Sequence, residues 1–347
     1  MAGRVYSESE LESFASEVQA VLSSCELEQP YDEGGVVWIN PHEPLGDVMA
    51  DAGVPDECRE EVAERVRCPS CGGHHELWEE VGVKSQGELR YESLMDEWYE
   101  KYAIRLNEFH DFLAKYPYLG VAHELGKELR DGVSRFPSRT IENEEFYRAR
   151  RITSGKNYAV SDFLPPDPTK CPVGEGRYNH AGQSVMYLAD DKDGAAIECV
   201  EDDEDRAWAQ KFRIQCIDNI LDLSDEERWA DENLPTLAFG LMHDGGVRGF
   251  ADRGNSWKPE YFIPRFVADC AREKGFSGIL FKSVRHWQSN LVLFKWDATN
   301  VVGEGDPEII QIAGWKRSDW KFKDSPIQIP FAETLLSDQI NPPEPDL

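Results

Sequence analysis

The sequence is poor in basic residues and contains no long apolar run. It has 37 Lys and Arg against 66 Asp and Glu, which gives a formal net charge of −29. Non-specific nucleic-acid binders and proteins adsorbed to anionic membranes both need a broad basic face, so these classes are excluded. No hydrophobic stretch approaches the roughly 18 residues of a membrane span, and the start lacks the basic-then-apolar pattern of a secretion signal. The sequence therefore predicts a cytoplasmic protein.

The cysteines show no repeating spacing, which favours reduced thiols over a disulfide framework. The exception is the CPSCGGHH segment at 68–75, which has the tight-turn spacing of half a zinc site but no second CxxC. Cys58, His74 or His75 are available to complete the ligands. We predict a structural zinc ion bound by Cys68, Cys71, His74 and Cys58, the alternative being that these thiols are simply buried.

The 347 residues suggest two domains, and the 40% of hydrophobic residues can fill more than one core. Amphipathic spacing predicts helices over 7–24 and 56–67. From Leu89 to Arg130 apolar residues recur at helical spacing, with a break around 116–120 that predicts two helices meeting there.

After Arg135 the pattern changes to short strand-like runs bounded by Gly, Pro and Asn. The predicted strands are 146–152, 184–190, 209–217, 278–284 and 290–296, and the predicted helices are 193–200 and 261–275. A helix does not separate each pair of strands, which argues against a doubly wound parallel sheet. We predict an α+β protein: a mainly helical region at 1–135, a mixed α/β domain at 136–315 and a Pro-rich tail at 316–347.

Two windows of this acidic chain contain no carboxylate at all. Tyr147 to Lys156 holds Arg148, Arg150, Arg151 and Lys156, and Phe276 to Trp296 holds Lys282, Arg285 and Lys295. Arg148 and Arg150 share one face of a strand, where two guanidinium groups can bind a diphosphate. The alternative is that these arginines pair with surface acids.

The glycine-rich segment GEGRYNHAG at 174–182 allows close backbone approach and supplies Arg177, Tyr178 and Asn179 in consecutive positions. It could equally be an ordinary turn. The sequence has neither a GxGxxG opening a helix nor a GxxxxGK[ST], so Rossmann and P-loop sites are not supported.

Glu198 lies in the apolar segment AAIEC, where a carboxylate is desolvated and needs compensation. Its alternatives are a buried salt bridge and a catalytic role. Ser283 follows the segment GILFK and lies outside any GxSxG elbow, so we interpret it as a hydrogen-bond donor to a ligand or a strand-end hydroxyl.

Taken in order, the segments FYRARR, GEGRYN, VMYLAD, AAIEC and GILFKSV with SNLVLF resemble the RES domain family over about residues 140–312. The family is known from bacterial toxin–antitoxin pairs. The resemblance implies a fold similar to that of ADP-ribosyltransferases and an activity that destroys NAD by hydrolysis or phosphorolysis of the nicotinamide–ribose bond.

Position by position, the resemblance implies catalytic roles for Arg148, Glu198 and Ser283. It implies NAD-binding roles for Arg177 and Tyr187, to which we add Tyr178, Asn179, Arg150 and Asn290. Tyr178 stands where many members have Trp. In this interpretation NAD is the substrate, Glu198 stabilises an oxocarbenium-like state, and the arginines hold the diphosphate.

The first part of the chain resembles the region that precedes some RES and HEPN domains. Arg105 and His110 have the R-x4-H spacing of HEPN ribonucleases, but the surrounding helix is acidic and would repel RNA. A protein ADP-ribosyltransferase and a non-catalytic NAD-binding module are further alternatives. The expected partners are NAD, an antitoxin or regulatory protein and a second copy of the chain, without nucleic acid or membrane.

Overall fold

The computed structural model describes residues 4–23, 41–200, 206–224, 233–243, 261–283 and 288–312. The chain divides into two compact units, Met1–Asp96 and Glu97–Leu347. The sequence analysis drew its boundary later, after Arg135. The structure groups 97–135 with the second unit because the aromatic rings of Phe109 and Phe266 pack edge to face, with centroids 5.1 Å apart. The Pro-rich segment 316–347 lies outside the described residues.

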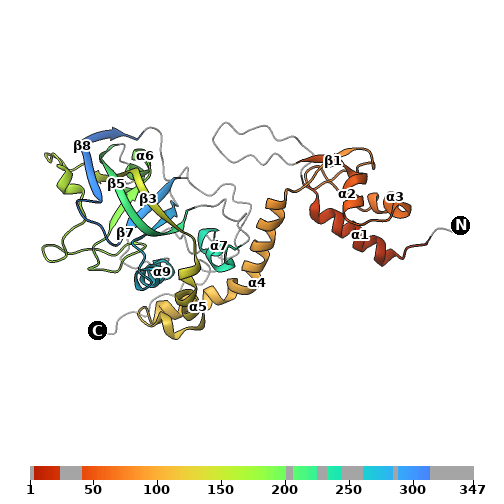
Figure 1. Ribbon diagram of the computed structural model, residues 1–347, viewed down its shortest axis with the longest axis horizontal. Helices are drawn as coiled ribbons and strands as arrows, with labels where there is room; N and C mark the ends of the chain where they lie inside the picture. The colour runs from red at the N-terminus through yellow and green to blue at the C-terminus, as the bar shows by residue number, and fades with distance from the viewer. Residues whose placement is uncertain are drawn as a thin grey trace, which may run out of the picture. The chain divides into compact units, whose positions relative to one another are not determined.

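The first unit is helical with one short two-stranded antiparallel sheet (Figure 1). Its elements are α1 (Glu8–Val21), β1 (His42–Pro44), α2 (Leu45–Asp51), η1 (Asp56–Cys58), α3 (Arg59–Ala63) and β2 (Glu80–Gly82), before α4 (Gln86–Lys115) begins. Ser7 and Glu10 form a capping box that starts α1, which confirms the first predicted helix. The second predicted helix is shorter than expected, because a 3-10 turn at η1 precedes α3.

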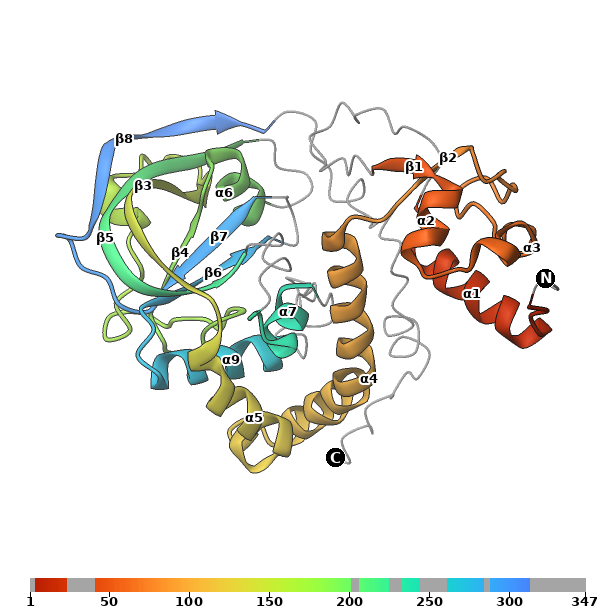
Figure 2. The same cartoon turned by 45° about the vertical axis from the view of Figure 1, so that its right-hand side comes forward.

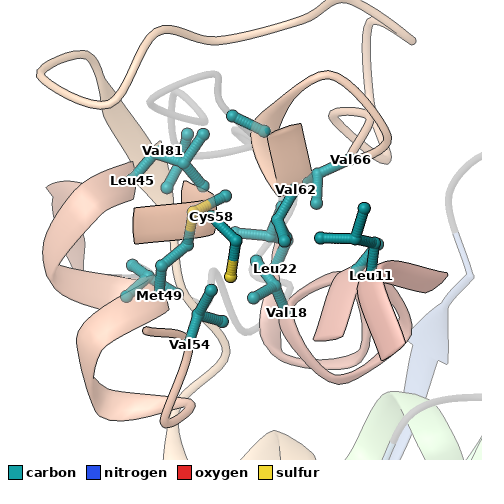
Figure 3. Packing of buried hydrophobic residues seen from close by; sticks show 13 residues of the cluster. Leu11, Val18, Leu22, Leu45, Met49, Val54, Cys58, Val62, Val66 and Val81 are labelled. Atoms are coloured by element: carbon teal, nitrogen blue, oxygen red, sulfur yellow. The ribbon is translucent and has the colours of Figure 1, made fainter. Parts of the chain in front are cut away.

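The core of the first unit is a cluster of buried aliphatic side chains (Figure 3). Val18 and Leu22 of the α1 segment meet Met49 of α2 and Val62 of α3, and all four are almost fully buried. Cys58 lies inside this cluster. Apolar contacts therefore hold the helices of this unit together. Each fully buried aliphatic side chain stabilises the folded unit by roughly 1.5–3 kcal/mol.

The second unit begins with the predicted pair of helices. Its described helical elements here are the second half of α4, then η2 (Gly120–Ala122), α5 (Glu124–Gly132) and η3 (Val133–Arg135). A β-carbon at Gly126 would lie 2.0 Å from the carbonyl oxygen of Gly120, so glycine allows α5 to approach the turn before it. The break predicted around 116–120 is confirmed.

The rest of the second unit is a six-stranded sheet with helices around it (Figure 2). The strands are β3 (Ser138–Arg151), β4 (Met186–Ala189), β5 (Arg206–Leu223), β6 (Gly278–Lys282), β7 (Ser289–Leu293) and β8 (Val301–Gln311). The remaining helical elements are η4 (Val160–Phe163), α6 (Lys192–Cys199), α7 (Thr236–His243) and α9 (Phe262–Glu273). The strand order is β3-β4-β7-β6-β5-β8, and a further β3–β5 pairing closes the sheet on itself. The predicted α+β class is confirmed, whereas β1, β2, α2, α7 and β8 were not predicted.

Alternation along the strands separates two faces of this closed sheet. One face carries a hydrophobic core that includes Phe146, Leu188 and Leu291. The other holds small residues such as Ala189 and Ala209, against which Ala196 of α6 packs. Because these side chains are small, α6 lies close to the sheet. The carboxylate of Glu198 in α6 therefore lies next to side chains at the ends of strands.

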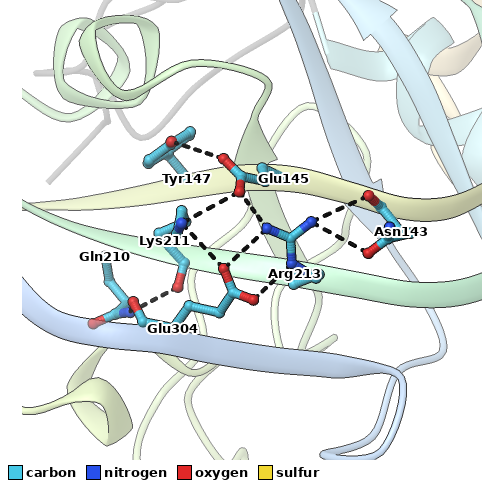
Figure 4. Close-up of polar contacts among 7 residues, drawn as sticks. All are labelled: Asn143, Glu145, Tyr147, Gln210, Lys211, Arg213 and Glu304. Atoms are coloured by element: carbon cyan, nitrogen blue, oxygen red, sulfur yellow. Dashed lines mark hydrogen bonds and ion pairs between the residues drawn. The ribbon is translucent and has the colours of Figure 1, made fainter.

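Charged side chains join β3, β5 and β8 on the sheet (Figure 4). Arg213 donates to Glu304 at 2.6 Å and also contacts Glu145, while Lys211 lies 3.1 Å from Glu304. These bonds lower the pKa of Glu304 to about 2.

Within the described residues, no helix is both long and apolar enough to cross a membrane.

Candidate active site

Glu198 lies in the last turn of α6, and its carboxylate accepts hydrogen bonds from two other segments. The hydroxyl of Ser283 donates to Oε1 of Glu198 at 2.6 Å. The amide nitrogen of Asn290 donates to the same oxygen at 2.8 Å. The side chain of Asp191 caps the start of α6 by accepting from the backbone N–H groups of Asp193 and Gly194. The orientation of the half-buried Glu198 is therefore fixed.

The pairing of three strands brings Ser283 and Asn290 to this carboxylate. Asn290 is opposite Phe281 in the β6–β7 pair and opposite Ala189 in the β4–β7 pair. The backbone N–H of Ser283 donates to the carbonyl of Gln288 and continues the β6–β7 pairing past the end of the strand. Within the described residues, Oδ1 of buried Asn290 has no hydrogen-bond partner. A buried acceptor of this kind is costly unless a ligand or water satisfies it.

Arg148 and Arg150 are two residues apart in β3, so their side chains lie on the same side of the strand. Arg150 donates from Nε to the backbone carbonyl of Asp162 at 3.2 Å. In the described part of the chain, Nη1 of Arg148 is buried and has no hydrogen-bond partner. Burial, followed by the charge of Arg150, lowers the pKa of Arg148 to about 9. Arg148 thus stays cationic at neutral pH, while its Nη1 is buried without a partner in the described part of the chain, which favours an anionic ligand over a structural ion pair.

The glycine-rich loop is organised by Asn179 and Tyr187. The hydroxyl of Tyr187 accepts from the N–H of Tyr178 at 2.9 Å and donates to Oδ1 of Asn179 at 3.1 Å. The amide of Asn179 also donates to three backbone carbonyls of the loop. A β-carbon at Gly176 would lie 2.5 Å from Asn179 Oδ1 and 2.8 Å from the Tyr187 hydroxyl, so only glycine fits there. Asn179 and Tyr187 therefore hold the loop against β4.

Tyr187 also links the two arginine-bearing segments electrostatically. Burial is the largest effect on Tyr187 and raises its pKa, while the charge of Arg177 opposes that rise. The same hydroxyl acts on the pKa of Arg148. Arg148 and Arg177 therefore each interact electrostatically with the same phenol.

Aromatic rings surround the side chains of Arg177 and Tyr178. The Arg177 guanidinium lies 5.8 Å from the ring centroids of both Tyr261 and Phe281. The buried ring of Tyr178 packs on Phe281, with centroids 4.6 Å apart. Phe281 lies in β6, two residues before Ser283, so this aromatic group is close along the chain to the residue that donates to Glu198.

Three polar residues of α9 attach the loop to the domain, and the sequence analysis missed them. Arg265 donates from Nε to the carbonyl of Gly176 at 2.9 Å and pairs with Glu175 at 3.1 Å. Asp269 bonds His180 at 2.8 Å, and Arg272 donates to the carbonyl of Tyr178 at 3.2 Å. Arg265 interrupts an apolar helical run, which is the same signal that singled out Glu198.

The predicted metal ligands separate into two groups in the first unit. Ligand atoms of Cys68, Cys71 and His75 lie within 4.8 Å of one another. Cys58 instead donates to the carbonyl of Pro55 at 3.4 Å inside the core. Nδ1 of His74 lies 2.8 Å from Arg67. The structure thus assembles a different set from the one predicted, with His75 in place of His74 and Cys58.

Two other sequence predictions concern basic residues. Arg105 donates to Glu128 at 2.6 Å, while the ring of His110 lies 6.0 Å from that of Phe262. The two members of the R-x4-H spacing therefore have different partners. Arg285 lies outside the described residues.

The fold and the site define a mixed α+β domain that contains a hydrogen-bonded carboxylate and a glycine-rich loop held by arginines. Residues 145–313 match the family model of the RES domain. Among solved structures, the chain is similar to one chain of the crystal structure of the M. tuberculosis MbcT-MbcA toxin–antitoxin complex. The identity is 15% over 55% of this chain and 94% of that chain, with a TM-score of 0.33. No curated protein matched.

Proposed function

We propose that the RES domain cleaves the bond between nicotinamide and ribose in NAD, with water or inorganic phosphate as the acceptor. The observation that carries the proposal is that one domain contains two buried polar groups, a hydrogen-bond donor and a hydrogen-bond acceptor. Nη1 of Arg148 is a donor and Oδ1 of Asn290 an acceptor, and neither has a partner among the described residues. Phosphate oxygens satisfy the first and a ribose hydroxyl satisfies the second.

Glu198 is the residue we assign to the chemical step. Departure of nicotinamide leaves positive charge on the ribose ring, and an oriented carboxylate stabilises that charge. Ser283 and Asn290 hold Oε1 of Glu198, which keeps the carboxylate in place while the charge develops. Nicotinamide is already a cationic leaving group, so the step needs no strong general acid.

Binding of the dinucleotide is assigned to the residues around Tyr187. Arg148 and Arg177 hold the diphosphate, and the ring of Tyr178 supports the nicotinamide ribose. Tyr187 and Asn179 act by fixing the loop, since their polar atoms bond within it. Arg150 contributes positive charge behind Arg148.

The acceptor decides between two reactions with different products. Attack of water at the ribose carbon releases nicotinamide, ADP-ribose and a proton. Attack of phosphate releases nicotinamide and ADP-ribose carrying a phosphate on that carbon. Lys282 and Arg150 are basic residues near the ends of β6 and β3 that could bind the phosphate.

The test is nicotinamide release from NAD by the purified full chain, with and without inorganic phosphate, followed by mass spectrometry of the products. We expect turnover and a free nucleotide product. Label from adenine-labelled NAD that remains on protein would indicate an ADP-ribosyltransferase. Binding of NAD without turnover would support a non-catalytic module. Degradation of total RNA instead of NAD would overturn the proposal.

Unrestrained cleavage of NAD by this domain would deplete the cell of a dinucleotide that it needs. We therefore extend the proposal to a protein antitoxin as partner, in line with the RES resemblance. Expression of the wild-type chain is expected to lower cellular NAD and arrest growth, whereas Glu198→Gln is expected to do neither. Growth arrest by both proteins at equal expression would argue against NAD loss as the cause.

A further inference from the structure

The first unit contains a cluster of two thiols and an imidazole, remote in sequence from the RES domain. The ligand atoms of Cys68, Cys71 and His75 lie within 4.8 Å of one another. Bonds of about 2.0–2.3 Å to a tetrahedral Zn²⁺ place neighbouring ligand atoms roughly 3.5–3.8 Å apart. A small contraction of the cluster therefore suffices to enclose the ion.

The backbone between the two cysteines is folded as a tight turn. The N–H of Cys68 donates to the carbonyl of Gly73, and the N–H of Gly72 donates to the carbonyl of Cys68, both at 2.9 Å. Gly72 has a φ of +69°, in the left-handed region that favours glycine. The N–H of Gly73 points at the Cys71 sulfur, with the nitrogen 3.4 Å from Sγ. Such a donor stabilises a thiolate, the form of cysteine that binds metal.

One ring nitrogen of His75 contacts a carboxylate, and the other is available to a ligand. Its Nδ1 lies 3.4 Å from the carboxylate of Glu79. Its Nε2 is buried and, among the described residues, has no hydrogen-bond partner. A carboxylate on one nitrogen with the other directed at a metal is the usual arrangement of a ligating histidine. Glu79 is itself fixed, since it accepts from the N–H of Glu76 at 2.9 Å.

We propose that Cys68, Cys71 and His75 bind one zinc ion, with a water in the fourth position and Glu79 as the residue that orients His75. Two thiolates and an imidazole are ligands that suit zinc. The ion would close the 68–75 segment, which connects α3 to β2, and so stabilise the first unit. This site is independent of NAD cleavage.

The first experiment is metal analysis of the full chain purified under reducing conditions without added metal. We expect about one zinc per chain. After removal of zinc with a chelator, Co²⁺ should restore the site and give the intense d–d bands and sulfur-to-cobalt charge-transfer bands of a tetrahedral thiolate complex. Absence of bound metal together with absence of a cobalt spectrum would overturn the proposal, as would a Cys68–Cys71 disulfide that persists in reductant.

The adjacent histidines provide a matched pair of variants. His75→Gln is expected to weaken zinc binding at least tenfold and to shift the cobalt d–d bands, whereas His74→Gln should leave both unchanged. Glu79→Gln is expected to weaken binding roughly 10- to 100-fold while retaining the cobalt spectrum. Equal loss in the His74 and His75 variants would contradict the assigned ligand set.

Two further cysteine variants separate ligand loss from unfolding. Cys71→Ser changes an exposed residue and is expected to abolish binding without loss of helical circular dichroism. Cys171→Ser changes an exposed thiol of the RES domain and should retain zinc. Retention of full zinc content by Cys71→Ser would also refute the site. Nicotinamide release by the same preparations reports on the proposed function separately.

Discussion

The hydroxyl of Ser283 donates a 2.6 Å hydrogen bond to the carboxylate of Glu198, although 85 residues separate the two in the sequence. Asn290 donates to the same oxygen. Hydrogen bonds to one carboxylate oxygen thus connect the end of α6 with the end of β6 and the start of β7. The bond connects two residues for which the RES resemblance implies catalytic roles.

Replacing the carboxylate of Glu198 by an amide tests its charge without changing its shape. In Glu198→Gln, the side-chain carbonyl can still accept from Ser283 and Asn290. We expect an unchanged melting temperature and a loss of NAD turnover of about 10²–10³-fold, because an amide cannot stabilise an oxocarbenium-like charge. Nicotinamide release and thermal denaturation are the measurements. Turnover within about threefold of the wild type would remove Glu198 from the mechanism.

Ser283→Ala removes one of the two donors that hold Glu198. Hydrogen bonds to charged groups contribute about 1.5–3 kcal/mol, which corresponds to roughly 10- to 100-fold in kcat. In the Glu198→Gln background the same change should have little further effect, because the two residues act as a unit. Fully additive effects in this double-mutant cycle would show that Ser283 acts independently of Glu198.

Arg148→Met should separate stability from binding. At neutral pH the desolvated cation destabilises the fold, so the variant is expected to melt a few degrees higher while its KM for NAD rises about tenfold or more. Arg130→Met is the control, since Arg130 pairs with Glu273 on the surface. A lower melting temperature with unchanged KM would mean that Arg148 is a structural residue.

The lowered pKa of Arg148 predicts a pH dependence with a definite sign. The free enzyme loses this cation as the pH rises through about 9, whereas the unfolded chain keeps it up to its ordinary value. Thus kcat/KM should fall above pH 9, and the destabilising effect of Arg148 should diminish over the same window. In Arg148→Met, kcat/KM should not fall above pH 9. If kcat/KM still falls in this variant, another group causes the loss of activity at high pH.

Gly176 and Gly174 offer a matched pair within one loop. Gly176→Ala places a methyl group against Asn179 and Tyr187, whereas Gly174→Ala places it in open space. The first variant should displace the loop and raise KM at least tenfold, and the second should change it less than twofold. Initial rates over a range of NAD concentrations measure both. Similar KM values for the two variants would show that this loop does not contribute to binding.

The charged network on β3, β5 and β8 predicts an acid dependence of stability. Arg213 and Lys211 lower the pKa of Glu304 to about 2. The contribution of Glu304 to folding stability is therefore present above about pH 4.5 and is lost as the pH falls toward 2. Glu304→Gln should melt lower than the wild type at pH 7, and the difference should narrow between pH 4.5 and 2. Glu308→Gln, on the same strand and exposed, should show no such narrowing. A pH-independent difference for Glu304→Gln would contradict the ion pairing.

Patterns local in sequence were sufficient for most of the elements. Helical spacing and the break at 116–120 predicted α4 and α5, and short strand-like runs bounded by Gly, Pro and Asn predicted the positions of β4, β6 and β7. β8 was missed because its run VVGEGDPEII contains glycines and a proline and is largely exposed, so its alternation is weak. Strand β5 is longer than its apolar run because its pairing with β3 and β8 extends it.

The sequence by itself determined which residues were chemically out of place: a glutamate among apolar neighbours, arginines in windows without acids, and a CxxC turn. Only the tertiary structure decided their partners. Strand register brought Ser283 and Asn290 to Glu198, α9 supplied Arg265 to the loop, and the direction of one turn selected His75 over His74. Spacing along the chain fixes the local backbone, but contacts between distant segments depend on how sheets and helices pack, and no local pattern encodes that packing.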